Sequence, residues 1–391
     1  MTQNEMQDRP LRGRVAVVTG ASRGAGRGIA LELGAAGATV YVTGRSTRAH
    51  PAGSYASILA MSGMQSLPGS IDDTADEVAR LGGTGIPVRV DHTREDEVRD
   101  LFARVEREHG GVDVLVNNAW GGHEAFSPTS FGAPFWEQSL DQWEAMFDRG
   151  VRNHLVASRI AAPVFIRQGR GLIVTTSYWD RGNYLRGNLF YDLAKAAMNR
   201  LAFGMAQELR PHGVASLAVV PGWMRTEFVL ASKNADESTW RDHPEFARTE
   251  SPRYVGRAVA ALAADPGVMR KSGGIHRAAD LAAEYGFTDV DGRLVPPFEL
   301  DEGHHRLGRV GGRRLGRVGG RRRHPPSRRA VGDRRGERGD AGRARGRVRR
   351  RQPLPRDPRA GIVTRIILPR SSGKLSFWVR RRVVRSIGPR A

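Results

Sequence analysis

Short apolar runs alternate with longer amphipathic segments along much of this 391-residue chain. The runs are rich in β-branched residues and occupy positions 14–18, 39–45, 87–91, 112–119, 171–177 and 213–222. The segments between them carry apolar residues at helical spacing, as in IALELGAAG after the first run. Nearly continuous apolar strands that alternate with helices are typical of a parallel sheet covered on both faces. The pattern therefore predicts an α/β fold built on a doubly wound parallel sheet.

Three segments depart from this rhythm. Residues 49–70 are rich in Gly, Ser, Ala and Met, which predicts a long loop before the next helix. Residues 230–250 are polar and irregular, and their position after the sixth run suggests a lid over a substrate. Beyond residue 303 the heptapeptide RLGRVGG occurs twice and Arg, Gly and Pro dominate, which favours disorder. We therefore expect a single domain over residues 1–303 and a disordered tail over residues 304–391.

The positive charge of the chain is concentrated in that tail. The formal net charge is +21, but residues 304–391 alone carry 28 Arg and one Lys against four acids, a charge of +25. About −4 is left for residues 1–303, so the basic composition does not describe the predicted domain. Three interpretations of the tail stay open: a frameshifted or unselected extension, a disordered segment that binds anions non-specifically, and a dedicated site for nucleic acid or an anionic membrane.

Composition also excludes several kinds of chemistry. The chain has no cysteine, which rules out disulfides, a thiolate nucleophile and cysteine-ligated metals. Its 11 histidines show no ligand spacing, so we expect no metal. The N-terminal residues lack the apolar stretch of a signal peptide, and no 18 apolar residues run together. We therefore expect a cytoplasmic protein.

A glycine-rich turn, TGASRGAGRG, follows the first predicted strand. Gly20 closes that strand, and Gly24 and Gly26 let the backbone pass close to a pyrophosphate, whose charge is met by amides at the helix N-terminus. Ser22 and Arg23 lie inside the turn and belong to the same predicted cofactor site. The alternative is a structural strand-to-helix turn that binds nothing.

Four further motifs follow the TGxxxGxG spacing of this turn. They are Asp91 after the third run, NNA at 117–119, YDLAK at 191–195 and PGWMRT at 221–226. With these motifs the chain resembles the short-chain dehydrogenases/reductases over most of the predicted domain. The resemblance implies a Rossmann fold, a nicotinamide cofactor, a small carbonyl or alcohol substrate and a homo-oligomer.

The same resemblance assigns roles to individual residues. Asp91 would hold the adenine end of the cofactor, and Asn117 would hold the backbone beside it. Read without the resemblance, these two residues are a turn-forming acid and an amide at a strand end. Thr226 would bind the nicotinamide carboxamide, although a helix N-cap is an alternative role for this threonine.

The end of the second predicted strand bears on the choice of cofactor. An acidic residue there would bind the ribose hydroxyls of NAD, whereas a cation would pair with the extra phosphate of NADP. The strand ends in Arg45 with no acid, and Arg23 offers a second guanidinium nearby. We therefore expect NADP(H) in preference to NAD(H), with two solvated arginines as the alternative.

Tyr191 and Lys195 are the candidate reacting pair. Residues four apart lie on one face of a helix, which is also true of many surface pairs. This pair, however, follows a strand that ends in Ser177, at the edge where such sheets bind ligands. A neighbouring ammonium and the charge of nicotinamide would lower the pKa of the phenol, so that Tyr191 can act as general acid or base. By resemblance, Lys195 also holds the nicotinamide ribose and Ser177 donates to the substrate oxygen.

The chain departs from the family pattern at two places. The family usually places its serine 13 residues before the tyrosine, which here is Tyr178; we assign Ser177 instead, with one extra residue in the loop between them. The family's asparagine, counted from Trp143, falls on Gly150. Asn153 lies three residues later, and we do not assign it that role.

Aromatic residues near the predicted strand ends are candidates for a substrate pocket, with packing in the core as the alternative. They are Trp120, Tyr178, Trp179 and Tyr184. The leading hypothesis is an NADP(H)-dependent oxidoreductase that interconverts a carbonyl and an alcohol. The alternative is a non-catalytic protein that senses nicotinamide nucleotides and uses its basic tail to bind nucleic acid or anionic surfaces.

Overall fold

The computed structural model of the chain describes residues 9–51, 66–125, 132–178, 184 and 187–299. These residues belong to one compact unit. The predictions for the tail over 304–391, for most of the loop over 49–70 and for Trp179 lie outside the described residues.

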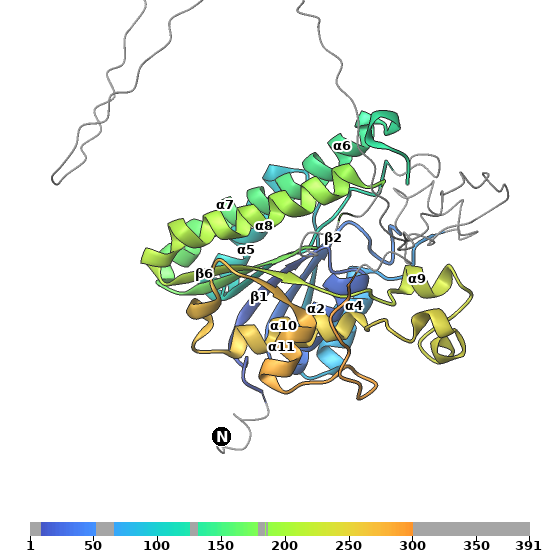
Figure 1. The fold of residues 1–391 in the computed structure, drawn as a ribbon. Helices are drawn as coiled ribbons and strands as arrows, with labels where there is room; N and C mark the ends of the chain where they lie inside the picture. Colours follow the sequence, from blue (N-terminus) through green and yellow to red (C-terminus); the bar gives the residue numbers. More distant parts are fainter. Residues whose placement is uncertain (1–8, 52–65, 126–131, 179–183, 185–186, 300–391) are drawn as a thin grey trace, which may run out of the picture. The chain divides into compact units, whose positions relative to one another are not determined.

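Within the described residues, seven parallel strands form one sheet in the order β3-β2-β1-β4-β5-β6-β7 (Figure 1). They are β1 Val15–Thr19, β2 Thr39–Gly44, β3 Thr84–Arg89, β4 Val114–Asn117, β5 Gly171–Thr176, β6 Val214–Val220 and β7 Ile275–Arg277. The first six correspond to the predicted strands, and the doubly wound parallel sheet is confirmed. β3 begins at Thr84, before the predicted start, because its whole length pairs with β2. The sequence did not predict β7, which has three residues and no apolar run.

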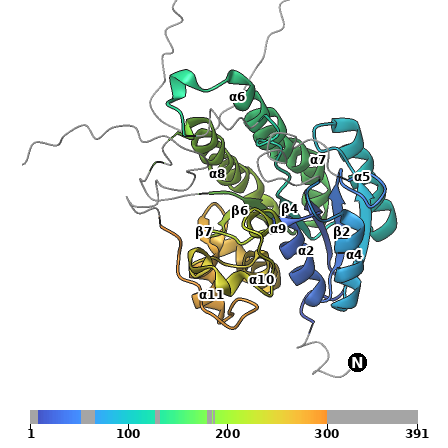
Figure 2. The same cartoon turned by 90° about the vertical axis from the view of Figure 1, so that its right-hand side faces the viewer.

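Helices cover both faces of this sheet (Figures 1 and 2). One face carries α2 Gly24–Ala35, α4 Ile71–Arg80, α10 Pro252–Ala264 and α11 Ala278–Tyr285. The other carries α5 Glu95–His109, α7 Arg152–Gln168 and α8 Leu189–Leu209. The remaining helical segments are α6 Leu140–Met146, the π-helical turn η2 Phe147–Val151, α9 Glu227–Ala231, and the 3₁₀ turns η1 Phe135–Glu137, η3 Arg210–His212, η4 Trp240–Asp242, η5 Pro244–Phe246 and η6 Val268–Lys271. None of the helices that the structure describes is long and apolar enough to cross a bilayer.

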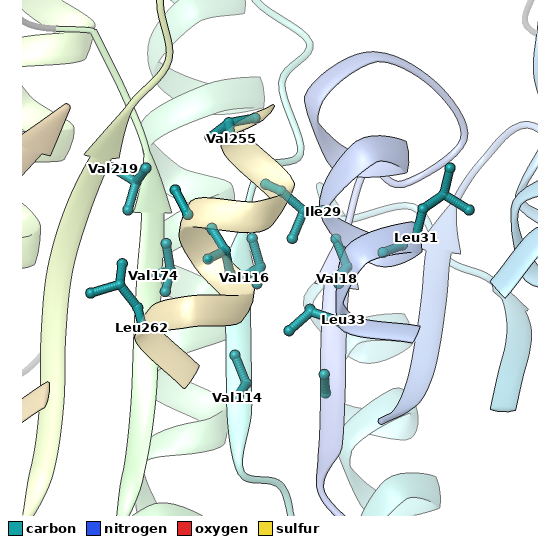
Figure 3. Packing of buried hydrophobic residues seen from close by; sticks show 14 of the residues in the cluster. Val18, Ile29, Leu31, Leu33, Val114, Val116, Val174, Val219, Val255 and Leu262 are labelled. Carbon is teal, nitrogen blue, oxygen red and sulfur yellow. The ribbon is translucent and has the colours of Figure 1, made fainter. Parts of the chain in front are cut away.

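The core explains why the strands are apolar at consecutive positions. Successive side chains of a strand point to opposite faces, and here both faces are covered. Figure 3 shows Val18, Val116, Val174 and Val219 of the strands beside Ile29 and Leu33 of α2 and Val255 and Leu262 of α10. The alternate residues Val17, Leu115 and Ile173 are equally buried, but against α5 and α7.

The segment predicted to be an irregular lid over residues 230–250 is partly ordered into helical turns. It contains the end of α9 together with η4 and η5, and it has a small core of its own formed by Leu230, Trp240 and Phe246. The sequence concealed this order because the three apolar residues are spaced too irregularly to show a period.

Candidate active site

The candidate site lies where the order of the strands reverses, between the carboxyl ends of β1 and β4. The hydroxyl oxygen of Thr19 accepts hydrogen bonds from the amides of Asn118 and Ala119, both at 2.9 Å. The side chain of Asn118 donates to the carbonyl oxygens of Thr19 and Gly20, both at 3.0 Å. Such a reversal point opens a crevice at the carboxyl edge of a doubly wound sheet, where ligands bind.

The glycine-rich turn presents the N-terminus of α2 to this crevice. Gly24 has a φ of +55°, which strains other residues, and an added Cβ at Gly26 would clash with the carbonyl oxygen of Gly20 at 2.3 Å, so both positions require glycine. The amide of Gly24 donates to a carboxylate oxygen of Glu227 at 2.8 Å, and Arg27 lies 3.6 Å from the other oxygen. This helix end therefore already binds an anionic group, and the residues fit the pyrophosphate of a dinucleotide.

Arg23 connects the turn to the end of β2. Its guanidinium donates to the hydroxyl of Ser46 at 3.1 Å and to the carbonyl oxygens of Pro68 at 2.8 Å and Gly69 at 3.0 Å. Ser22, the preceding residue, is buried. The predicted cation of the turn thus lies next to the end of β2, as the cofactor hypothesis requires.

Arg45 is engaged by carboxylates. Its guanidinium donates to Glu124, which also pairs with Arg149 at 2.9 Å, and it lies 4.0 Å from Asp91. Burial acts to raise the pKa of Asp91, but hydrogen bonds from Thr93 and the charge of Arg45 outweigh it and hold the pKa below its usual value. Glu124 was not among the predicted site residues, because it lies 79 positions from Arg45 in a loop without a motif.

The structure brings the three predicted catalytic residues together at the carboxyl end of β5. The hydroxyl of Ser177 donates to the backbone carbonyl of Lys195 at 3.1 Å. Tyr191 and Lys195 lie one turn apart on α8, and the ammonium of Lys195 is 5.5 Å from the centre of the Tyr191 ring.

Burial dominates the protonation of this pair. It raises the pKa of Tyr191 to about 12, with a smaller contribution from the carboxylate of Asp192, and it lowers the pKa of Lys195 to about 7. The lower pKa that the sequence led us to expect for the phenol of Tyr191 is therefore not found in the protein without its cofactor. The reason is that desolvation penalises the charged form of each group more strongly than Lys195 favours the phenolate.

Aromatic rings surround Tyr191. Trp120 meets it edge to face at 5.8 Å between ring centres, His123 stacks on it at 6.1 Å, and Tyr178 lies tilted at 6.1 Å. Trp120 and Tyr178 therefore lie where the sequence placed them, whereas Tyr184 is 43% exposed and His123 was missed. Burial lowers the pKa of His123 to about 4, so this imidazole is neutral near pH 7.

Two predicted cofactor ligands have structural partners. The side chain of Asn117 is buried and donates to the hydroxyl of Ser158 at 2.8 Å, toward α7. The neighbouring Asn118 is the residue that holds the glycine-rich turn. Thr226 accepts from the amide of Val229 at 3.3 Å, which is the N-cap arrangement given above as its alternative role.

The place expected for the family's asparagine lies in the π-helical turn η2. Gly150 is buried there. Asn153 donates from its side chain to the backbone carbonyl of Arg149 at 2.8 Å, so its amide stabilises the turn.

A glycine-rich turn at a sheet reversal point, with a Tyr-Lys pair at the neighbouring strand end, defines a nicotinamide-dependent dehydrogenase or reductase. The chain belongs to the short-chain dehydrogenase/reductase family. It is similar to dehydrogenase/reductase SDR family member 1 of Mus musculus, with 40% identity over 295 residues, which cover 74% of this chain and 87% of the relative. The family model described as enoyl-(acyl carrier protein) reductase matches residues 55–269.

Solved structures of the family share the fold. A short-chain dehydrogenase from Mycobacterium thermoresistibile is 28% identical, with a TM-score of 0.60, over 74% of this chain and 94% of that one. A metagenomic short-chain oxidoreductase in complex with NADP is 26% identical, with a TM-score of 0.50, over 68% of this chain and 96% of that one. The Rossmann fold inferred from the motifs is thereby confirmed.

Proposed function

We propose that the protein is an NADP(H)-dependent oxidoreductase that interconverts a carbonyl and an alcohol by hydride transfer, with Tyr191 as general acid and base. The observation that carries this proposal is the placement of Tyr191, Lys195 and Ser177 at the carboxyl end of β5, next to the crevice between β1 and β4. An ordinary surface pair on a helix would be solvated, whereas burial perturbs the pKa of both Tyr191 and Lys195.

Each of the three residues has a distinct task in this reaction. In reduction, the phenol of Tyr191 donates its proton to the carbonyl oxygen, and the hydroxyl of Ser177 turns from the Lys195 carbonyl to donate to the same oxygen. The cofactor, when bound, supplies or accepts the hydride. In oxidation, Tyr191 takes the proton of the alcohol, and the ammonium of Lys195 stabilises the phenolate by its charge.

The preference for NADP(H) rests on the two arginines beside β2. A guanidinium binds phosphate through charge-assisted hydrogen bonds, and Arg23 and Arg45 both approach the end of this strand. On Arg45 a phosphate would have to displace the carboxylate of Glu124. Arg23 donates to the hydroxyl of Ser46 and to the carbonyl oxygens of Pro68 and Gly69, so we propose it as a second ligand of the same phosphate.

The surroundings of Tyr191 favour an apolar substrate. Trp120, Tyr178 and the neutral imidazole of His123 lie against the phenol, and flat apolar surfaces of this kind pack well on aromatic or alicyclic rings. We propose that the substrate is a small cyclic or aromatic ketone or the corresponding alcohol.

Exposed apolar residues on α7 and α8 support a homo-oligomer. Leu155 and Ile166 of α7 are 47% and 38% exposed, and Leu193 and Phe203 of α8 are 41% and 38% exposed. Burying such residues against a second copy is favourable.

The test measures turnover and cofactor binding separately. Tyr191→Phe should abolish turnover of a panel of cyclic ketones, a loss of about 10²-fold or more, while NADPH still binds. Wild-type protein should bind NADPH more tightly than NADH in calorimetry. Turnover that survives Tyr191→Phe would contradict the catalytic assignment, and binding of neither nucleotide would contradict the enzyme reading altogether.

A further inference from the structure

The indole of Trp120 is the common neighbour of the reacting groups. The ammonium of Lys195 lies 4.0 Å from the centre of the indole, over its face, which is a cation–π distance. The ring forms a T-shaped pair with the ring of Tyr191, and its N–H donates to Nδ1 of His123 at 3.3 Å. One rigid side chain thus contacts the ammonium, the phenol and the imidazole.

Two glycines make the space that this ring occupies. An added Cβ at Gly150 would lie 2.6 Å from Cζ3 of Trp120 and 2.8 Å from its Cε3. An added Cβ at Gly122 would lie 2.3 Å from Cζ2 and 2.6 Å from Cε2, at the opposite bond of the same six-membered ring. Any other residue at either position would displace the indole.

The π-helical turn fixes the loop that carries Trp120. The carbonyl of Arg149, inside η2, accepts from the amide of Gly121 at 2.8 Å as well as from the side chain of Asn153. His154 lies 3.2 Å from the carbonyl of Ala119. Residues on both sides of Trp120 are therefore bonded to one helix, and π-helical turns of this kind are often found at functional sites.

Lys195 depends on this ring for its position. Its other contacts are the Tyr191 ring and the sulfur of Met198 at 3.8 Å. Among the described residues, no carboxylate pairs with its ammonium. The titratable groups facing this region are His123 on the loop, His154 on α7, and Asp192 beside Tyr191 on α8.

We propose that Trp120 is a positioning residue, whose ring face favours the charged form of Lys195 and holds the ammonium beside Tyr191. The proposal rests on the proposed function, since it gives Lys195 a catalytic task. Trp120 fills the place next to Gly150 where the family pattern expects an asparagine side chain. In this chain, the cation–π contact of Trp120 thus replaces part of the support that an asparagine side chain at this place would give to the reacting residues.

Titration of Lys195 tests the proposal without any assay of turnover. The chain has four lysines, so its ¹³C-labelled lysine side chains give few NMR signals, and Lys195→Arg identifies the one of interest. Trp120→Leu should lower the titration midpoint of Lys195 by about one pH unit, because it removes the ring face. Trp120→Phe should leave the Lys195 midpoint close to the wild-type value, because it keeps an aromatic ring at this position. Trp143→Leu is the matched control, since Trp143 packs on Phe147 and Phe190 and should leave the midpoint unchanged.

Kinetics on the same variants gives the second readout. Trp120→Leu should lower kcat about tenfold and move the alkaline limb of its pH profile downward by the same unit, whereas Trp120→Phe should stay within about threefold. An unchanged Lys195 midpoint in folded Trp120→Leu would overturn the inference, as would equal effects of Leu and Phe. If Trp120→Leu shifts the Lys195 midpoint but the wild-type protein shows no turnover, the inference stands and the proposed function is wrong.

Discussion

Gly150→Ala is expected to destabilise the protein, although alanine is the better helix former. The new Cβ would lie 2.6 Å from the Trp120 ring, whereas ordinary contacts begin at 3.4 Å, so the ring or the helix must move by about 0.8 Å. Overpacking of this kind costs about 1–3 kcal/mol, and Gly to Ala in a helix returns about 0.5–1 kcal/mol. We therefore expect a net loss of up to about 2.5 kcal/mol, centred near about 1 kcal/mol, in the free energy of unfolding.

Gly204→Ala is the matched control for this substitution. Gly204 lies inside α8, and an added Cβ there meets nothing within 4 Å, so the same change should stabilise the protein by about 0.5–1 kcal/mol. Urea unfolding of both variants gives the comparison. In a Trp120→Ala background the cost of Gly150→Ala should disappear, with a coupling energy of about 1 kcal/mol or more. If Gly150→Ala is as stable as Gly204→Ala, or costs the same without the indole, the packing argument is wrong.

Three further predictions concern charge. Glu227→Gln should tighten NADPH binding several-fold in calorimetry, because the pyrophosphate no longer competes with a carboxylate for the amide of Gly24; weaker binding would count against that competition. Arg23→Gln should weaken NADPH binding roughly tenfold and NADH binding little, and an equal loss for both would refute its role as the phosphate ligand. The unfolded chain protonates Lys195 up to about pH 10.5 but the folded chain only up to about pH 7, so the free energy of unfolding should rise with pH in that window. Lys195→Met should remove that part of the rise, and parallel pH profiles of the two proteins would contradict the lowered pKa of this buried amine.

The inner strands of the sheet could be predicted from the sequence because β1, β2, β4, β5 and β6 are buried on both faces. Such strands give continuous apolar runs, and the glycine-rich turn marks the first strand-to-helix connection unambiguously. β7 could not be found in this way, since it lies at the edge of the sheet and Ile275 is 38% exposed. Burial on both faces thus marks the inner strands, whereas the edge strands are marked less well: the predicted start of the partly exposed β3 was too late, and β7 was missed.

The candidate site could be predicted where residues with suitable chemistry also have a sequence spacing that brings them together. Tyr191 and Lys195 share a helix face, and their proximity follows from the helical repeat. The partner of Arg45 does not follow from any local rule, because Glu124 comes from a loop 79 positions away in sequence. Trp120 was recognised only as an aromatic residue near a strand end, and its contact with Gly150 requires the tertiary structure.

The late segment of the chain acts on the site through a buried arginine. Arg225 is 1% exposed and lies 3.3 Å from Asp289 and 3.4 Å from Asp291, while the Trp240 ring lies 4.3 Å from its guanidinium carbon. Removing the partner of such a charge is costly, so this arrangement fixes the backbone next to Thr226. Because Thr226 and Glu227 lie against the glycine-rich turn, the segment YGFTDVDGR over residues 285–293, which carries Asp289 and Asp291, helps to fix the segment that we propose to bind the cofactor.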